Sequence, residues 1–101
     1  MKSVKVTYQV KLEFVEQNKK NIQTVMNYLK DNPIKGMYYS SYQLDDEGAF
    51  MHINFAHDEV TMNKLNDVKA FVDFRMQLKA SKPIEAPKSQ EIELVGAGWN
   101  I

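Results

Sequence analysis

The sequence contains no cysteine, which excludes disulfide bonds, thiolate metal sites and cysteine nucleophiles. It also lacks net charge, because thirteen Lys and Arg residues balance thirteen Asp and Glu residues. A neutral chain has no general attraction to phosphate backbones, so we expect no nucleic-acid partner. No run approaches the roughly 18 apolar residues of a membrane span, and the N-terminus lacks the continuous apolar core of a signal peptide. We therefore expect a cytoplasmic protein with no membrane partner.

What is present is an ordinary globular composition, with 44% apolar and 26% charged residues in a chain of 101 residues. That length predicts a single domain over residues 1–101 with one modest core. Alternation of period two predicts strands, and apolar residues spaced three and four apart predict helices. The pattern gives strands over 4–14, 36–44, 49–56 and 91–101, and helices over 18–31 and 58–80.

Local signals set the expected boundaries of these elements. Asn18 and Asp58 are predicted to cap the starts of the two helices. We expect Asn66-Asp67 to interrupt the second helix, with Asp67 capping its second segment. Two prolines predict a loop over 81–90, and a shift of the alternation at 94–96 predicts a bulge in the last strand.

The order β-α-β-β-α-β predicts an α+β, ferredoxin-like fold: a four-stranded antiparallel sheet with both helices on one face. The middle hairpin is rich in Tyr, Met and Phe on both of its faces, although two helices can cover only one. A second copy packed sheet against sheet would cover the other, so we predict a homodimer. Trp99 and Ile101 are the candidate interface residues. The alternative is that Trp99 covers the core of its own protomer.

Three features together resemble a known family. They are the long alternating strand VKVTYQVKLEF, the hairpin ending in Phe-Ala before Asp58-Glu59, and the helix DEVTMNKLNDVKAFVDFRMQL with its spaced aromatics Phe71 and Phe74. This layout resembles the dimeric α+β barrel superfamily, and especially its antibiotic biosynthesis monooxygenase-like branch. The resemblance implies a homodimer with one small pocket per protomer between the sheet and the helices. Members include cofactor-free oxygenases acting on polycyclic phenols and haem-degrading enzymes.

The resemblance does not extend to haem degradation. The haem-degrading members use a His and a Trp on or just before the second helix, and this sequence has neither type between Asp58 and Leu78. No other residue role transfers from the family. We therefore expect no cofactor, and the candidate residues follow from their own chemistry.

Arg75 is the sole arginine and is predicted near the centre of the apolar stripe of the second helix, set by Val68, Phe71, Val72 and Leu78. A guanidinium there needs a carboxylate, carbonyl oxygens or an anionic ligand. It could anchor an acidic or phenolate ligand at the mouth of a pocket. The alternatives are an internal ion pair with a glutamate, such as Glu13, Glu91 or Glu93, or a stem that covers the core while its head lies in water.

The remaining candidate ligand-binding residues are His52, Asn54, Tyr8 and Tyr39. His52 and Asn54 share one face of their predicted strand, where they could orient a polar ligand. Tyrosines can line an amphiphilic pocket and bond a substrate oxygen, although each of these residues could equally serve packing alone. His57 lies five residues from His52, a spacing that places the two on no common face, so we predict no metal site.

Two interpretations of function follow. The first is a small-molecule-binding protein of the monooxygenase-like type, or a cofactor-independent oxygenase acting on an apolar or phenolic ligand. It requires a pocket at which the candidate residues converge. The alternative is a non-catalytic dimeric module, structural or regulatory, with no substrate pocket. Opposite orientations of Tyr8 and His52 would argue against a shared catalytic site.

Overall fold

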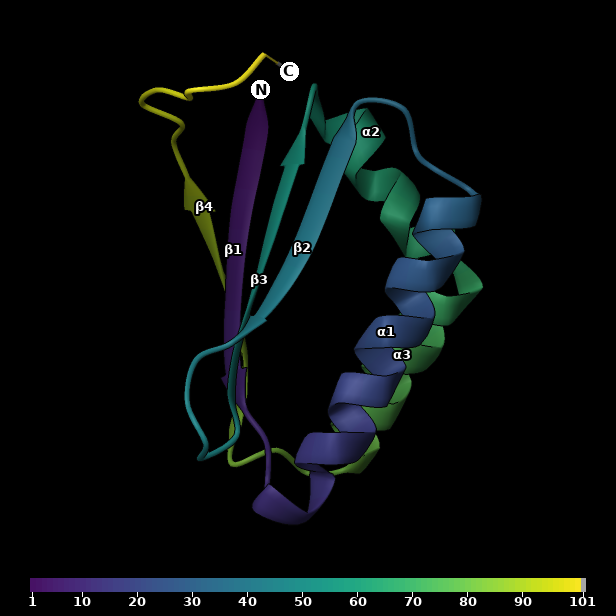
Figure 1. Cartoon of the computed structure of the whole chain (residues 1–101), viewed down its shortest axis with the longest axis vertical. Coiled ribbons are helices and arrows are strands. Elements are labelled where there is room, and N and C mark those ends of the chain that lie inside the picture. The colour runs from purple at the N-terminus through teal and green to yellow at the C-terminus, as the bar shows by residue number, and fades with distance from the viewer. Residues whose placement is uncertain (101) are drawn as a thin grey trace.

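The computed structural model describes residues 1–100. Its four strands and its helices follow one another in the order shown in Figure 1. The elements are β1 (Lys2–Gln9), the 3-10 turn η1 (Leu12–Phe14), α1 (Val15–Asp31), β2 (Met37–Gln43), β3 (Ala49–Ala56), α2 (Glu59–Asn63), the 3-10 turn η2 (Lys64–Asp67), α3 (Lys69–Ala80) and β4 (Glu85–Ile92). Among these described residues there is no helix of the length and apolarity needed to cross a membrane.

The four strands form one antiparallel sheet in the order β2-β3-β1-β4. The helices α1 and α3 lie side by side in a layer over one face of this sheet (Figure 1). The opposite face carries no helix within residues 1–100 and is flanked at one end by the chain that follows β4. This arrangement confirms the predicted α+β, ferredoxin-like fold class.

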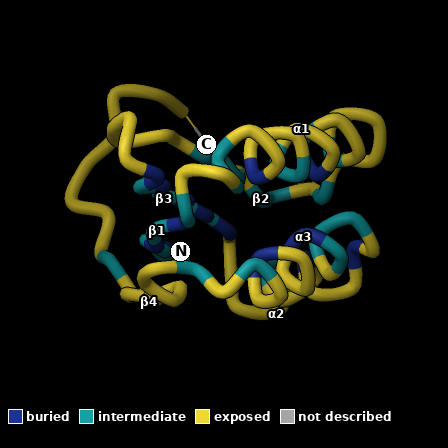
Figure 2. Tube along the Cα trace, turned by 90° about the horizontal axis from the view of Figure 1, so that it is seen from below, coloured by how far each residue is buried: buried dark blue, intermediate teal, exposed yellow. Residues whose placement is uncertain are grey.

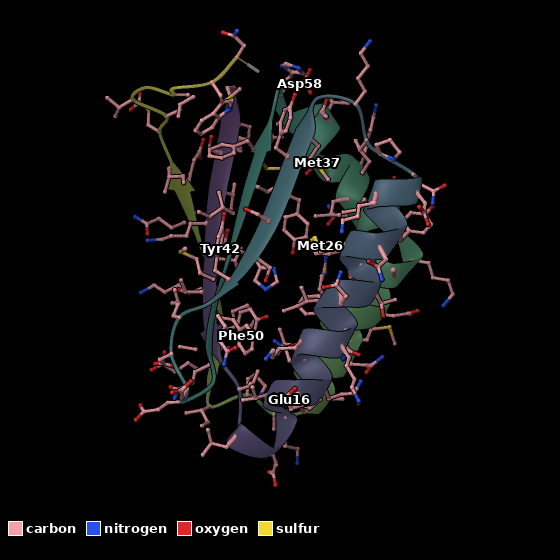
Figure 3. The ribbon with its side chains drawn as sticks, in the orientation of Figure 1. Glu16, Met26, Met37, Tyr42, Phe50 and Asp58 are labelled. Carbon is pink, nitrogen blue, oxygen red and sulfur yellow. The ribbon has the colours of Figure 1, made fainter. Side chains whose placement is uncertain are left out.

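Strand register determines which side chains face the helices. Tyr8 pairs with Phe50, and Val6 pairs with His52, so these four side chains share the face covered by the helices. Burial alternates strictly along β3, as predicted for this strand (Figure 2). In Figure 3, the side chain of Phe50 points from the sheet toward the helix layer. The buried core is the set Tyr8, Val10, Val25, Phe50, Phe74 and Leu78.

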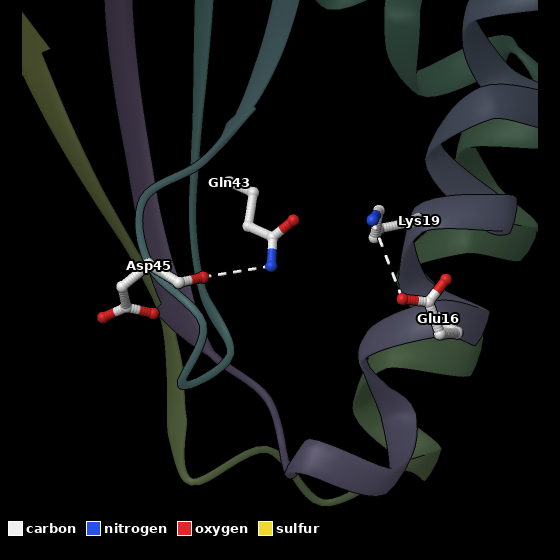
Figure 4. Close-up of polar contacts among 4 residues, drawn as sticks. All are labelled: Glu16, Lys19, Gln43 and Asp45. Atoms are coloured by element: carbon white, nitrogen blue, oxygen red, sulfur yellow. Dashed lines mark hydrogen bonds and ion pairs between the residues drawn. The ribbon is translucent and has the colours of Figure 1, made fainter.

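The turn between β2 and β3 is built around Asp45. Its carboxylate accepts hydrogen bonds from the backbone N–H groups of Glu47 and Ala49, and Gln43 Nε2 donates to the Asp45 carbonyl at 3.0 Å (Figure 4). Gly48 has a φ of 93° and its carbonyl accepts from Val10 N at 2.9 Å. The turn therefore ties the hairpin to the chain leaving β1. Figure 4 also shows the surface ion pair of Lys19 with Glu16 on α1.

The first strand is shorter than the predicted 4–14. Gln9 forms the last pair of β1, opposite Ala49, because β3 begins there and offers no further partner. The chain then turns into η1 and reaches α1 at Val15. The alternation of residues 10–14 therefore belongs to a connection. Asn18 lies inside α1 and is fully buried, so its predicted role as the N-cap is wrong.

The second helical region breaks as predicted, but Asp67 does not cap its second segment. Asp58 caps α2, accepting a hydrogen bond from Thr61 N at 2.7 Å. The residue before α3 is Val68, whose side chain makes no cap hydrogen bond. Val72, a member of the predicted stripe, is 36% exposed, because the buried face of α3 runs through Phe74 and Leu78. The predicted stripe is thus rotated.

The last strand was placed wrongly. β4 spans Glu85–Ile92, so most of it lies in the predicted loop 81–90 and only Glu91 and Ile92 belong to the predicted strand; residues 93–100 form no strand. β4 lies at the edge of the sheet, and its register against β1 shifts between Thr7 and Gln9. An edge strand with an irregularity tolerates Pro87, because the missing N–H need not join the ladder. Residues 94–96, where a bulge was predicted, lie outside β4.

Candidate functional site

A cavity of about 670 Å³ lies between the inner face of the sheet and the segment running from α2 to α3. This volume is within the range of small-molecule sites. All five predicted ligand-binding residues line it: Tyr8, Tyr39, His52, Asn54 and Arg75. Apolar side chains make up much of the remaining wall, including Val4, Val6, Met62, Leu65, Phe71, Phe74 and Leu78.

His52 forms the centre of a hydrogen-bonded chain on this wall. Its Nε2 is 2.7 Å from the Tyr8 hydroxyl, and its Nδ1 is 2.7 Å from the Tyr39 hydroxyl. Ser41 Oγ is a more distant neighbour of Nε2, at 3.3 Å. Tyr8 and His52 therefore point to the same face, as a shared site requires. Three adjacent strands supply the chain, because β3 lies between β1 and β2.

The sequence interpretation missed the fourth member of this chain. Asn18 projects from α1, and its Nδ2 donates to the Tyr8 hydroxyl at 3.0 Å. Its Oδ1 is buried with no hydrogen-bond partner in residues 1–100. The predicted first strand ran to residue 14, which placed the start of the helix at Asn18. Because residues 12–14 form the turn η1 and α1 already begins at Val15, Asn18 lies inside the helix. An asparagine one turn into an amphipathic helix was the available signal.

Burial keeps this chain uncharged near neutral pH. It lowers the pKa of His52 to about 4, because the imidazolium form loses its hydration. Burial also raises the pKa of Tyr8 to about 12, although the hydrogen bond from Asn18 acts in the opposite direction. The pKa of Tyr39 is raised above its usual range by burial, with a smaller contribution from Tyr8. The site thus holds one neutral imidazole and two neutral phenols.

The tautomer of His52 decides which tyrosine hydroxyl remains free to bind a ligand. A neutral imidazole has one N–H and one acceptor nitrogen. A phenol hydroxyl can donate one hydrogen bond and accept two. In the His52 tautomer that carries its proton on Nδ1, Tyr8 accepts from Asn18 and donates to His52 Nε2. His52 then donates through Nδ1 to the Tyr39 oxygen. The Tyr39 O–H is left without an acceptor and lies at the cavity wall, where it can donate to a ligand oxygen.

Asn54 contributes a second polar group to the same wall. It is 7% exposed, and its Oδ1 has no hydrogen-bond partner among the described residues. A buried amide oxygen without a partner is costly. Rotation of the amide by half a turn would exchange Oδ1 with Nδ2, so Asn54 can present either a donor or an acceptor to a ligand.

Arg75 lies at the rim of the cavity and not at the centre of a buried stripe. It is exposed, because α3 buries Phe74 and Leu78 instead. Its guanidinium carbon lies 5.6 Å from the centre of the Phe71 ring, and Nη1 donates to Asn66 Oδ1 at 3.2 Å. The alternative of an internal ion pair with a glutamate is not observed in residues 1–100.

The predicted interface residues lie elsewhere. Trp99 is 58% exposed and packs edge to face against Phe55, with ring centres 6.4 Å apart. Phe55 lies on the sheet face opposite the helices, because its neighbours Asn54 and Ala56 face inward. Trp99 therefore does not cover the core between the sheet and the helices. Ile101 lies outside the described residues.

His57 stays apart from the cavity. It follows β3, is exposed, and donates through its backbone N–H to the Gly36 carbonyl at 3.0 Å. No group of three or more His, Asp or Glu side chains placed to hold a metal ion occurs within residues 1–100.

The fold is shared with several solved structures. A protein described as an antibiotic biosynthesis monooxygenase superposes with a TM-score of 0.80 at 14% identity, over 95% of this chain and 100% of that one. A Caulobacter crescentus protein proposed to be an antibiotic biosynthesis monooxygenase gives 0.80 at 14%, over 94% and 90%. Rv0793 from Mycobacterium tuberculosis gives 0.80 at 8%, over 97% and 98%.

This chain has the antibiotic biosynthesis monooxygenase-like fold. The resemblance stated from the sequence is thereby confirmed at the level of architecture. At these identities the likeness concerns fold, and function must be argued from the site. No family model matches the sequence, and no curated protein matches it at a significant level.

Proposed function

We propose that this protein binds a small, largely apolar ligand bearing a phenol or carbonyl oxygen in the cavity of about 670 Å³. The observation that carries the proposal is the Tyr8–His52–Tyr39 chain on the cavity wall, with both hydrogen bonds at 2.7 Å. The chain orients the Tyr39 hydroxyl, and the apolar wall matches a hydrophobic ligand body. A module that served packing alone would need no such cavity.

The electrostatics favour binding over general base catalysis. An effective general base has a pKa near the working pH, whereas burial lowers the pKa of His52 to about 4. The imidazole is therefore a weak proton acceptor at neutral pH. It serves instead to fix the orientation of the two tyrosine hydroxyls.

The proposal is tested by titrating the protein with the fluorescent probe anthracene-2-carboxamide, which combines an apolar ring system with a carbonyl oxygen. Tyr39→Phe removes the free hydroxyl and is expected to weaken binding about five- to tenfold, as for loss of one hydrogen bond. Tyr38→Phe is the matched control, since Tyr38 pairs with Phe55 and lies on the opposite face; it should change nothing.

A second pair of variants tests the location of the probe. Ala86 is exposed and lines the cavity, so Ala86→Trp should obstruct binding without disturbing the core. Ala80 is exposed at the end of α3 and does not line the cavity, so Ala80→Trp should bind normally. Absence of probe binding to the wild type, or equal binding by Ala86→Trp, contradicts the proposal.

We also propose that the protein is a homodimer joined through the sheet face opposite the helices. That face carries the side chains Tyr38, Tyr42, Met51, Ile53 and Phe55, with Trp99 packed beside them. Tyr38 and Tyr42 are each 48% exposed. A second copy would remove this apolar surface from water.

Light scattering after size exclusion tests the homodimer. We expect the mass of two chains for the wild type, and Trp99→Lys or Ile53→Lys to shift the equilibrium to one chain. Tyr28 is similarly exposed but lies on α1, so Tyr28→Lys should leave the dimer intact. A wild-type protein of monomer mass at micromolar concentration contradicts the proposal.

A further inference from the structure

The cavity carries charge of one sign. Only two of its lining residues have charged side chains, Arg75 and Lys79, and both are cationic. Acidic residues are as numerous as basic ones in the sequence, yet no Asp or Glu lines the cavity. The excess of positive charge is therefore local to the site.

The helix that supplies these cations keeps its own acid elsewhere. Asp73 forms an ion pair with Lys69 at 2.8 Å. Neither Arg75 nor Lys79 has an ion-pair partner within residues 1–100. Both lie four residues apart on α3, a spacing that places their side chains on one face of the helix.

Arg75 is also held in place before any ligand arrives. The Phe71 ring lies under its guanidinium and Asn66 accepts one of its hydrogen bonds. These contacts use one of the five N–H donors, so the rest remain free for a planar anion. An oriented guanidinium loses less conformational freedom on binding than a mobile one.

The two ends of the cavity thus differ. The deep wall presents neutral hydroxyl, imidazole and amide groups, whereas the rim presents two cations. We infer that the natural ligand is an amphiphile with a carboxylate at one end, which pairs with Arg75 and Lys79 at the rim while its apolar body fills the cavity. This inference rests on the proposed function and adds the charge of the ligand to it.

The test compares two probes of the same shape and different charge. Anthracene-2-carboxylate and anthracene-2-carboxamide share their ring system, and only the first is anionic at neutral pH. We expect the carboxylate to bind at least about tenfold more tightly, as for charge-assisted hydrogen bonds in a partly desolvated site. Raising NaCl from about 0.05 to about 0.5 M should weaken the carboxylate alone.

Variants then identify the responsible residues. Arg75→Gln is expected to weaken the carboxylate about tenfold and to leave the carboxamide within about twofold, and Lys79→Gln should act in the same direction with a smaller effect. Arg75→Lys should recover part of the loss. The control is Lys20→Gln, an exposed α1 residue outside the cavity lining, which removes the same charge and should have no effect.

The outcomes separate this inference from the proposed function. Equal affinity for the two probes, or equal losses from Arg75→Gln and Lys20→Gln, overturns the carboxylate inference while the cavity remains a binding site. Failure of both probes to bind overturns the proposed function instead.

Discussion

Removal of the Tyr8 hydroxyl tests the buried chain most severely. In Tyr8→Phe the ring is retained, so its stacked contact with Phe50, at 5.6 Å between ring centres, is preserved. What disappears is the partner of Asn18 Nδ2 and the near partner of His52 Nε2. Asn18 is 0% exposed and its Oδ1 already has no described partner, so water cannot replace the lost bond.

The magnitude follows from the cost of a buried polar group without a partner, about 1–3 kcal/mol each. Asn18 bears this cost in full. His52 bears part of it, because Ser41 Oγ remains 3.3 Å away. We therefore expect Tyr8→Phe to lower the free energy of unfolding by about 2–3 kcal/mol.

The assay is equilibrium urea denaturation at one fixed protein concentration, followed by circular dichroism. In the double variant Tyr8→Phe, Asn18→Leu the orphaned amide is gone, so we expect about 1 kcal/mol or more to be recovered relative to the sum of the single changes. Tyr28→Phe, at an exposed site on α1, should stay within about 0.5 kcal/mol of the wild type. A Tyr8→Phe cost below about 0.5 kcal/mol, or strict additivity in the double variant, would refute the reasoning.

Three further predictions concern pH, a turn and a helix cap. Burial holds the pKa of His52 at about 4, below its ordinary value of 6.5, so the unfolded chain binds more protons. The free energy of unfolding should therefore fall by about 2 kcal/mol as the pH is lowered from about 7.5 to about 5. In urea titrations His52→Gln should flatten this dependence of the unfolding free energy on pH, and an unchanged dependence counts against the assignment. Gly48→Ala should destabilise by at least about 2 kcal/mol, because its φ is 93° and the new Cβ would lie 2.3 Å from the Val10 carbonyl oxygen, whereas Gly96→Ala, with nothing within 4 Å, should be neutral in thermal melts. The hydrogen bond from Thr61 N to the Asp58 carboxylate caps α2 and lowers the pKa of Asp58. Asp58→Ala should lower the urea midpoint, whereas Asp58→Asn should retain it, because an amide oxygen can accept the same hydrogen bond; equal losses would exclude capping.

The sequence predicted the fold correctly where the alternation of a segment matches the way that segment pairs in the sheet. The alternation of β3 arises because one face of this strand packs toward the helices, and it placed His52 and Asn54 correctly on that face. In the alternating segment VKVTYQVKLEF, Tyr8 belongs to the apolar side, and this side of β1 faces the helices. Because both strands belong to one sheet, shared orientation was enough to bring Tyr8 and His52 together.

The errors arose where a local pattern lacked its tertiary context. Residues 10–14 alternate like a strand, but a strand ends where its partner ends, and that partner's start at Ala49 is set by the turn. Pro87 reads as a loop residue unless the strand is known to lie at an edge. On α3 the pattern of apolar residues misjudged which face is buried: the helix packs Phe74 and Leu78 against the core and leaves Val72 exposed, so Arg75 lies at the rim.

The most direct test of the central claim is nitrogen NMR of protein labelled with ¹⁵N in its histidines. The sequence has two histidines, and only His52 lines the cavity, so His57 is an internal reference. We predict that His52 shows the two distinct nitrogen signals of a neutral imidazole at neutral pH, and that saturating anthracene-2-carboxamide shifts them while the His57 signals stay in place. A His52 spectrum of a protonated ring, or one that the probe leaves unmoved, would contradict a ligand site built on the Tyr8–His52–Tyr39 chain.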